Sequence, residues 1–428
     1  MADDMSLIFS GAALLLLGAF SCTKAQPDAR RAETAAVATQ SSAPAPSPEL
    51  SAEDRKRFQD AASLAWKYLN DNYQSSTGLV NATADWPNTT LWDIGGQLLA
   101  FHSAKGLGLL SQADFDSRVK TVLGTLEKAP LFHNVAYQKI YSTRTGGIGE
   151  GGGKGFAATD LGRFLVAMKV LSVTEPQHAA QIARIVKRID FKPIVSDGYM
   201  HGQLIGSNGK PFTFQEGRIG YEQYTARGFK EWGADVSNAL DLSKNAAPVK
   251  VYGVPLLGDK RFQDRLLSEP FILYGLELGM PDDVKQLAEN VLRAQQARFD
   301  STGKMTIVSE DASSVPPQYF YYYCVYCNGK RYVIDIAMPG NEQDGPRWVS
   351  TKAAFGWYAL MPGDYTRKAV GYVASAADPK RGWASGVGEV NGKPTNAFDI
   401  NTASVILEAA YYALRGSKPL IDPTGAAR

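Results

Sequence analysis

The sequence is poor in the residues that build metal and redox centres. Its 428 residues include only three cysteines and four histidines. The single C-x-x-C pair, Cys324 and Cys327, is too little for a structural zinc site, which needs four ligands. The motifs H-E-x-x-H and G-x-S-x-G and the nucleotide-binding glycine fingerprints do not occur in it. We therefore expect neither a metal nor a cofactor.

An excess of charge of either sign is also missing. Lysine and arginine together number 45 and aspartate and glutamate 43, a net charge of +2. Nucleic-acid binding needs clustered excess cations, so we expect no nucleic-acid partner. The 44% of hydrophobic residues can fill a large core, which excludes a wholly disordered chain.

One long apolar run is present, at residues 6–21. At about 1.5 Å per residue it would reach roughly 24 Å as a helix, short of a typical bilayer span, so a secretory signal fits better. It ends in Gly18-Ala19-Phe20-Ser21-Cys22, which resembles a bacterial lipoprotein signal in which Cys22 is lipidated. Ala19 and the acidic start of the chain depart from that pattern, and plain secretion or a membrane anchor are the alternatives.

These features predict four segments. Residues 1–22 are a lipoprotein-type signal, and 23–50, rich in Ala, Pro and Ser, are a flexible linker that cannot offset its ordering entropy. Residues 51–420 form the folded domain and 421–428 a tail. We expect a periplasmic, lipid-anchored protein. The outer membrane is favoured, because Thr23 replaces the acidic residue linked to inner-membrane retention.

Apolar residues at helical spacing predict about eleven helices, mostly in pairs. Their ranges are 51–69, 91–104, 111–126, 160–173, 176–189, 221–232, 271–279, 281–299, 351–360, 365–376 and 401–414. Strands are expected at 305–308 and 319–336, and in a hairpin over 199–214 around Asn208-Gly209. This pattern favours a mainly α fold, an (α/α)6 toroid whose long loops build a cleft at one end; an α-solenoid lacks the repeat it requires.

Acidic and aromatic residues gather near several helix starts. Asp93 follows Trp92, and Asp160 precedes Arg163; both acids could equally serve as helix caps. Glu222 lies between Tyr221 and Tyr224, whose rings could desolvate it, raise its pKa and make it a proton donor. A helix-start Glu bonded to its own backbone is the alternative.

Further candidates lie near the C-terminus. Glu389 and Asp399 occur in loops rich in glycine and aromatics, close to Trp383. Glu408 lies on an apolar helix, where a buried carboxylate needs a partner. In an exported protein we expect Cys324 and Cys327 to form a local disulfide.

Taken in order, the motifs resemble a bacterial glucoamylase-like family catalogued as a domain of unknown function. They are Thr90-Leu91-Trp92-Asp93-Ile94-Gly95, Tyr141-Ser142-Thr143-Arg144-Thr145, Asp160-Leu161-Gly162-Arg163, Gly220-Tyr221-Glu222-Gln223-Tyr224, Ser350-Thr351-Lys352-Ala353 and Asn401-Thr402 through Glu408. The family is remotely similar to six-hairpin glycosidases, including endo-β-1,2-glucanases of glycoside hydrolase family 144 and cyclic β-1,2-glucan synthases. The resemblance implies an (α/α)6 toroid with a glycan cleft.

The resemblance also implies roles for individual residues. Glu222 would be the general acid, and Asp399 or Glu389 the base, in an inverting mechanism. The sugar contacts would come from Trp92, Asp93, Arg144, Asp160, Arg163, Tyr221, Tyr224, Lys352, Trp383, Asn401 and Glu408. The aromatics among them, and the run Tyr321-Tyr322-Tyr323, could equally belong to the core.

The sequence therefore predicts a lipid-anchored glycoside hydrolase acting on a bacterial glucan or exopolysaccharide. The alternatives are a polysaccharide lyase, or a glycan-binding or assembly subunit that works with exopolysaccharide assembly proteins. Hydrolysis needs two carboxyl groups that flank the scissile bond. An arginine pair on Glu222 would contradict its role as the acid.

Overall fold

The computed structural model describes residues 50–150, 154–206, 208–261, 264–314, 320–335 and 345–422. They belong to one compact unit, Ser47–Arg428. The predicted signal with Cys22, nearly all of the linker and most of the tail lie outside the described residues. Among the helices described, none combines the length and apolar character needed to cross a membrane.

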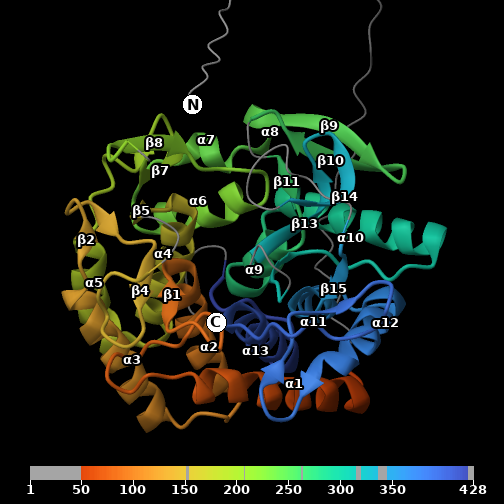
Figure 1. Ribbon diagram of the computed structural model, residues 1–428, viewed down its shortest axis with the longest axis horizontal. Coiled ribbons are helices and arrows are strands. Elements are labelled where there is room, and N and C mark those ends of the chain that lie inside the picture. Colours follow the sequence, from red (N-terminus) through yellow and green to blue (C-terminus); the bar gives the residue numbers. More distant parts are fainter. Residues whose placement is uncertain are drawn as a thin grey trace, which may run out of the picture. The chain divides into compact units, whose positions relative to one another are not determined.

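Six of the described helices form a closed inner ring in which each contacts the next and the last contacts the first (Figure 1). Most of them are largely apolar around their circumference, as expected of helices covered on all sides, whereas the helix Tyr221–Glu231 is more polar. These helices are α2 (Leu91–Gly106), α4 (Ala158–Thr174), α6 (Tyr221–Glu231), α9 (Glu269–Glu277), α11 (Thr351–Leu360) and α13 (Ile400–Leu414).

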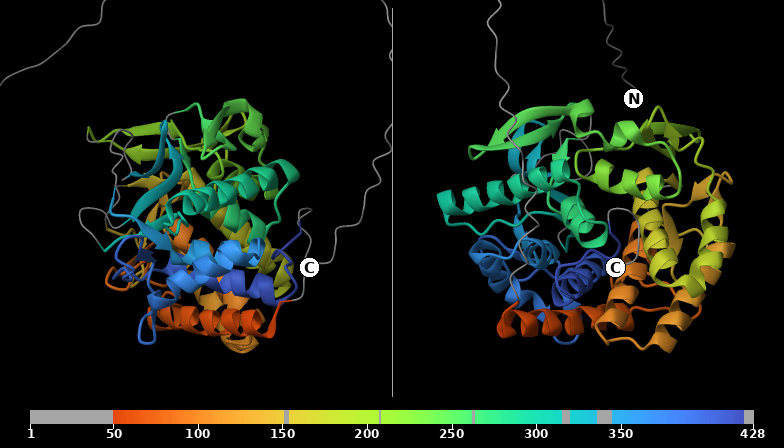
Figure 2. Two further views of the ribbon diagram at one scale, coloured as in Figure 1. Left: turned by 90° about the vertical axis from the view of Figure 1, so that its right-hand side faces the viewer. Right: turned by 180° about the vertical axis from the view of Figure 1, so that it is seen from behind.

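Outer helices alternate with the inner ones along the chain and lie around them (Figure 2). They are amphipathic: α1, for example, buries Phe58, Ala61, Ala65 and Leu69, which recur at helical spacing. The outer helices are α1 (Ala52–Asp71), α3 (Gln112–Lys128), α5 (Ala179–Lys187), α10 (Asp282–Thr302) and α12 (Asp364–Tyr372), with the short α7 (Ser237–Leu240) and α8 (Leu242–Asn245) between α6 and α9. This alternation confirms the (α/α)6 toroid.

Short antiparallel strands occupy the connections between helices. The longest form the hairpins β7–β8 (Tyr199–Ile205, Pro211–Gln215), β9–β10 (Ala246–Val251, Val254–Asp259) and β13–β14 (Phe320–Cys327, Lys330–Asp335). Strands β12 (Glu310–Ala312) and β11 (Arg265–Leu266) pair with β13. The remaining strands are β1 (Asn88–Thr90), β2 (Leu131–Phe132), β3 (Ala136–Tyr137), β4 (Ile140–Ser142), β5 (Gly155–Phe156), β6 (Val195–Ser196), β15 (Trp348–Ser350), β16 (Ala377–Asp378), β17 (Gly382–Trp383) and β18 (Gly386–Gly388).

The predicted helices agree with this structure to within a few residues, whereas most of the short strands were not predicted. Residues 305–308 were expected as a strand, but they lie outside the strands, and β12 begins only at Glu310. Helices α7 and α8 are short and were not predicted, and the hairpin β9–β10 was missed although Val249, Val251, Val254 and Leu256 alternate around its turn. The predicted helix ranges 176–189 and 365–376 each include a 3-10 turn, at Pro176–His178 and Val373–Ala376.

Candidate active site

The first turns of the inner helices meet at one end of the ring. Lys352, at the start of α11, donates to Glu269 Oε2 of α9 at 2.7 Å. Asn401, at the start of α13, donates to Glu269 Oε1 at 2.6 Å and accepts from Arg163 Nη1 of α4 at 2.9 Å. These contacts join residues that are far apart in the sequence. Charged residues from several inner helices therefore lie together at the end of the ring where those helices begin.

Asp160, in the first turn of α4, is half-buried and keeps contact with solvent. Burial, with smaller contributions from nearby Glu216, Asp93 and Glu310, raises its pKa from 3.8 to about 8, although Lys139 acts to lower it. A carboxylic acid with a pKa of about 8 carries a proton at neutral pH and can donate it.

Glu310 is the second half-buried carboxyl group in this region. It accepts a hydrogen bond from Tyr221 Oη at 2.6 Å. Burial and the charge of Glu269 raise its pKa, whereas the cations Arg218 and Lys352 and the bond from Tyr221 lower it. Compared with Asp160, Glu310 therefore has more groups near it that stabilise an ionised carboxylate.

Aromatic rings surround these two acids. Tyr322 is half-buried and lies directly opposite Glu310 on the neighbouring strand, so the two side chains share one face of the sheet. Trp92 is also half-buried; its ring centroid lies 5.7 Å from that of Tyr221 and 4.8 Å from the Arg163 guanidinium carbon. Flat faces of this kind can pack against a sugar ring.

Five more deeply buried acids lie with Asp160 and Glu310: Asp93, Glu216, Glu269, Asp311 and Asp399. We call these seven acids, together with the cations Lys139, Arg218 and Lys352, the carboxylate cluster. Asp311 is buried, which raises its pKa to about 8, and it accepts from Ser350 Oγ at 2.8 Å. The acids outnumber the bases, so this end of the ring disfavours a polyanionic ligand.

Several predicted site residues lie in the cluster, among them Asp399, which was predicted as a base, but they serve the structure first. Asp93 forms a capping box with Thr90 at the start of α2, and burial raises its pKa to about 6. Asp399 caps α13 by accepting from Thr402 N at 2.7 Å, and burial raises its pKa too. Lys352, Asn401 and Asp399 are nearly fully buried. Their role is therefore to position neighbouring residues of the cluster, because they do not face solvent.

Glu222 does not have the surroundings of a free proton donor. It is 1% exposed, and Arg261 donates to both of its carboxylate oxygens, at 2.9 and 2.6 Å. Gln215 donates to the first oxygen at 2.9 Å. Burial raises the pKa of Glu222, but both oxygens are engaged by the Arg261 pair. The predicted role as the acid is contradicted by this arginine pair.

Glu389 is held in the same way. Arg298 donates to its two oxygens at 2.9 and 2.8 Å, and Tyr323 Oη donates to Oε2 at 2.9 Å. These three donors occupy most of the acceptor sites of the carboxylate, so Glu389 does not have the surroundings of a free base. The arginine pair therefore disfavours its predicted role as the base.

Arg163, Tyr224 and Glu408 form a buried network beneath the cluster. Arg163 Nη2 lies 3.9 Å from Glu277 and 3.6 Å from Glu408, and Tyr224 Oη donates to Glu277 at 2.5 Å. All four side chains are fully buried, and burial raises the pKa of Glu408 well above its usual value. The prediction that Arg163, Tyr224 and Glu408 contact sugar is contradicted by this burial.

Three further predictions fail on position or bonding. Trp383 is a core residue that donates to Ala61 O at 3.0 Å and packs on Phe355. Arg144 is exposed in the loop after β4, next to Thr145, which lines a different hollow. Cys324 and Cys327 are buried free thiols, so the predicted disulfide is absent from the described structure.

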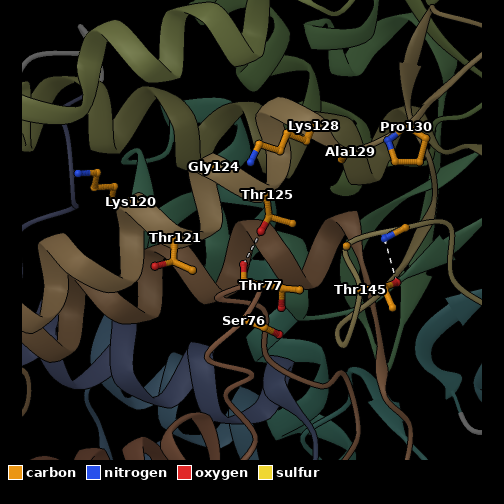
Figure 3. A pocket seen from close by; sticks show the side chains of 12 residues that line it. Ser76, Thr77, Lys120, Thr121, Gly124, Thr125, Lys128, Ala129, Pro130 and Thr145 are labelled. Atoms are coloured by element: carbon orange, nitrogen blue, oxygen red, sulfur yellow. Dashed lines mark hydrogen bonds between the residues drawn. The ribbon is translucent and has the colours of Figure 1, made fainter.

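That hollow lies beside α3 and has a volume of about 470 Å³ (Figure 3). Its lining consists of small polar residues and the lysines Lys120 and Lys128, and Thr125 Oγ1 donates to Thr77 O at 2.7 Å across it. None of the acids of the carboxylate cluster lines it.

The sequence analysis assigned no site role to Glu310, Asp311, Glu269, Glu216, Arg218 or Lys139. Glu310 and Asp311 follow the apolar pair Ile307-Val308 after one serine, and this acidic pair was an available signal. Glu269 lies at a helix start, but its role depends on Lys352 and Asn401, which are distant in the sequence.

A family model described as "Protein of unknown function (DUF3131)" matches residues 60–416, most of the chain. The chain belongs to the DUF3131 family. Comparison of this DUF3131 protein with curated protein sequences finds no match.

Solved structures share its fold at low sequence identity. A candidate glucoamylase from Bacteroides caccae is 13% identical and has a TM-score of 0.64, over 85% of this DUF3131 protein and 94% of the other. An endo-β-1,2-glucanase from Chitinophaga pinensis, in complex with sophorotriose and glucose, is 14% identical with a TM-score of 0.63, over 86% and 94%. An endo-β-1,2-glucanase from Talaromyces funiculosus, in complex with sophorose, is 14% identical with a TM-score of 0.59, over 85% of each chain.

Proposed function

We propose that this DUF3131 protein is a glycoside hydrolase that cleaves an uncharged bacterial glucan or the uncharged backbone of an exopolysaccharide. The observation that carries the proposal is the pair Asp160 and Glu310, two half-buried acids that share one electrostatic environment among aromatic rings. The fold it shares with β-1,2-glucanases supports the same class of reaction. The excess of acids in the cluster favours a neutral glycan.

The two acids take different roles in this proposal. Asp160, with a pKa of about 8 and one cation near it, keeps its proton and protonates the leaving glycosidic oxygen. Glu310 is held by Tyr221 and lies near Arg218 and Lys352, so it is the one that ionises and activates water. The negative charge of an ionised Glu310 contributes to the raised pKa of Asp160, which helps Asp160 to keep its proton.

Inversion of the anomeric configuration is part of the proposal. It requires about 6.5–9.5 Å between the two carboxyl groups, to leave room for a water molecule. Proton NMR of the first product formed distinguishes the α from the β anomer. Retention would contradict the roles given to Asp160 and Glu310.

The decisive experiment measures new reducing ends after incubation with β-1,2-glucan, other β-glucans and exopolysaccharides. Asp160→Asn and Glu310→Gln should each lower the rate by about 100- to 10,000-fold, the usual contribution of a general acid or base. The matched control is Asp364→Asn, because the Asp364 side chain is 94% exposed on α12. Unsaturated products that absorb in the ultraviolet would instead indicate a lyase.

The second candidate is a glycan-binding or assembly subunit without catalysis. The arginine pairs on Glu222 and Glu389 favour it, because they remove two of the acids expected to react. Binding of a glucan without release of reducing ends, in both the natural protein and Asp160→Asn, would establish this role. In either case we propose a periplasmic protein anchored by a lipid on Cys22, as the signal-like segment indicates.

A further inference from the structure

A second hollow, of about 490 Å³, lies apart from the carboxylate cluster. Three elements build it: the end of α10 supplies Arg298 and Lys304 follows it, β14 supplies Arg331 and Tyr332, and the β9–β10 turn supplies Tyr252. Arg347 completes the lining. Tyr322 shares a face with Glu310, and the next residue of the strand, Tyr323, lies against Tyr332 with ring centroids 6.5 Å apart. Successive strand residues face opposite sides, so the hollow lies behind the sheet that carries the cluster.

The hollow is strongly basic. Arg298, Lys304, Arg331 and Arg347 line it, and Arg298 pairs with Glu389. Within the described part of the chain, neither Lys304 nor Arg331 forms an ion pair. The whole chain carries a net charge of only +2, so this is a local concentration of positive charge. Such a concentration in a hollow attracts an anion.

The buried arginine at its base is held in one geometry. Arg298 is 6% exposed, is bound at both ends of its guanidinium by Glu389, and donates to Thr306 Oγ1. Its guanidinium carbon lies 5.0 Å from the ring centroid of Tyr332. The floor of the hollow is therefore preorganised, which reduces the ordering cost of binding.

Tyr332 shows an unusual backbone and an unpartnered hydroxyl. Its φ is +51°, a left-handed conformation that is costly for a bulky residue and that no tight turn requires inside β14. Its side chain is 3% exposed, and its hydroxyl has no hydrogen-bond partner among the described residues. Strain and unpaired polar groups of this kind are concentrated at ligand sites.

Tyr252 gives the hollow an accessible aromatic face. It is 38% exposed at the tip of the β9–β10 hairpin, and its ring centroid lies 5.8 Å from that of Tyr332. A large exposed ring beside several cations combines a flat apolar surface with charge. A ligand that matches both would carry a ring with an apolar face and an anionic group.

We propose that this hollow binds an acidic saccharide, with its carboxylate at Lys304 and Arg331 and a sugar ring on Tyr252. Arginine matches the geometry of a carboxylate through paired N–H donors, and the volume lies within the range of small-molecule sites. The site is independent of the proposed hydrolysis. It would hold an acidic glycan, or the acidic substituents of a glycan whose neutral backbone reaches the carboxylate cluster.

The test is calorimetric titration of the full chain with two ligands that differ only in charge. Tetraglucuronate and cellotetraose share the β-1,4 linkage, and only the first carries carboxylates. We expect tetraglucuronate to bind more tightly by about tenfold or more, the value of one charge-assisted hydrogen bond. The double variant Lys304→Gln/Arg331→Gln should lose that preference, and Tyr252→Ala should weaken both ligands.

A matched control removes two cations from the other hollow. Lys120→Gln/Lys128→Gln changes the net charge equally and should leave tetraglucuronate binding unchanged. An equal loss of affinity for tetraglucuronate in the two double variants would contradict the proposed site, because it would show that the attraction depends only on net charge. Displacement of tetraglucuronate by inorganic phosphate at equal concentration would overturn the saccharide assignment. Binding of tetraglucuronate is measured without any cleavage, so failure of the hydrolase proposal leaves this result intact.

Discussion

At the scale of single residues, the ability of a carboxyl group to give or take a proton depends on the residues that surround it. Glu222 and Glu389 are each paired with an arginine, whereas Asp160 and Glu310 are half-buried with raised pKa values. A sequence shows that an acid is present, but not whether a cation 39 residues away reaches it, as Arg261 reaches Glu222. The proposed roles therefore follow the surroundings of the four acids.

Glu222→Gln tests the structural role of that pair. The change removes one of the two carboxylates that pair with the Arg261 guanidinium. The free energy of unfolding should fall by about 2 kcal/mol, less than the full cost of breaking a buried pair because Asp259 still binds Arg261. Urea denaturation measures this loss. The rate of glucan cleavage per folded molecule should change by less than about threefold; a 100-fold loss with an intact fold would restore Glu222 as the acid.

Asp160→Asn tests the raised pKa of that group through stability. The pKa rises from 3.8 in the unfolded chain to about 8 in the fold, so between these values the folded state retains a proton that the unfolded chain has lost. Folding stability contributed by this group is therefore fully present below pH 4 and is lost as the pH rises to 8. The variant should be more stable than the natural protein at pH 8, by on the order of 2 kcal/mol after allowance for solvent contact, and nearly equal at pH 4.

Urea titrations at the two pH values check this expectation. Asp364→Asn serves as the control, because its exposed side chain should show no such trend. A stability difference for Asp160→Asn that is the same at both pH values would contradict the raised pKa.

At the scale of elements, the close approach of α4 and α6 sets the spacing of the first turns that carry Asp160 and Tyr221. Gly162 and Gly228 face one another across this contact. A Cβ at Gly228 would collide with the backbone carbonyl of Gly162, and a Cβ at Gly162 would collide with Thr225. A backbone carbonyl cannot move aside as a flexible side chain can, so the two helices would have to separate.

Gly228→Ala should therefore destabilise the fold by about 3 kcal/mol, at the upper end of the cost of overpacking a core. Gly124→Ala is the matched control in the outer helix α3, where a Cβ meets nothing within 4 Å. It should stabilise the protein by about 0.5–1 kcal/mol, because alanine loses less backbone freedom than glycine. Thermal unfolding of the two variants measures both effects, and a Gly228→Ala protein as stable as the natural one would disprove the close packing.

At the scale of the whole molecule, the predicted anchor and the folded unit are separable. Cys22→Ala should abolish incorporation of radioactive palmitate and release the protein into the soluble periplasmic fraction. The thermal midpoint of the folded unit should not change, because Cys22 precedes the unit Ser47–Arg428. Labelling that persists in Cys22→Ala, or an unlabelled natural protein, would contradict lipidation.

Much of the architecture was readable from apolar periodicity. The helix at 351–360 was predicted with the bounds of α11, and most inner helices agree within a few residues. Most of those helices, α6 excepted, are apolar on all faces, and the outer ones have an apolar stripe. The sequence pattern therefore indicates two layers of helices that alternate along the chain. The 237–259 region was missed because α7, α8 and β9–β10 are short and depend on contacts with the rest of the fold.

The active-site candidates were partly readable, for a different reason. The sequence by itself determined that acids and aromatics occur at the starts of the inner helices, since Asp93, Asp160 and Glu222 all lie in first turns. Only the tertiary structure decided which of them meet a cation and which keep contact with water. Charge pairing and burial act between residues that are distant in the chain, such as Tyr221 and Glu310, and no local pattern records those distances.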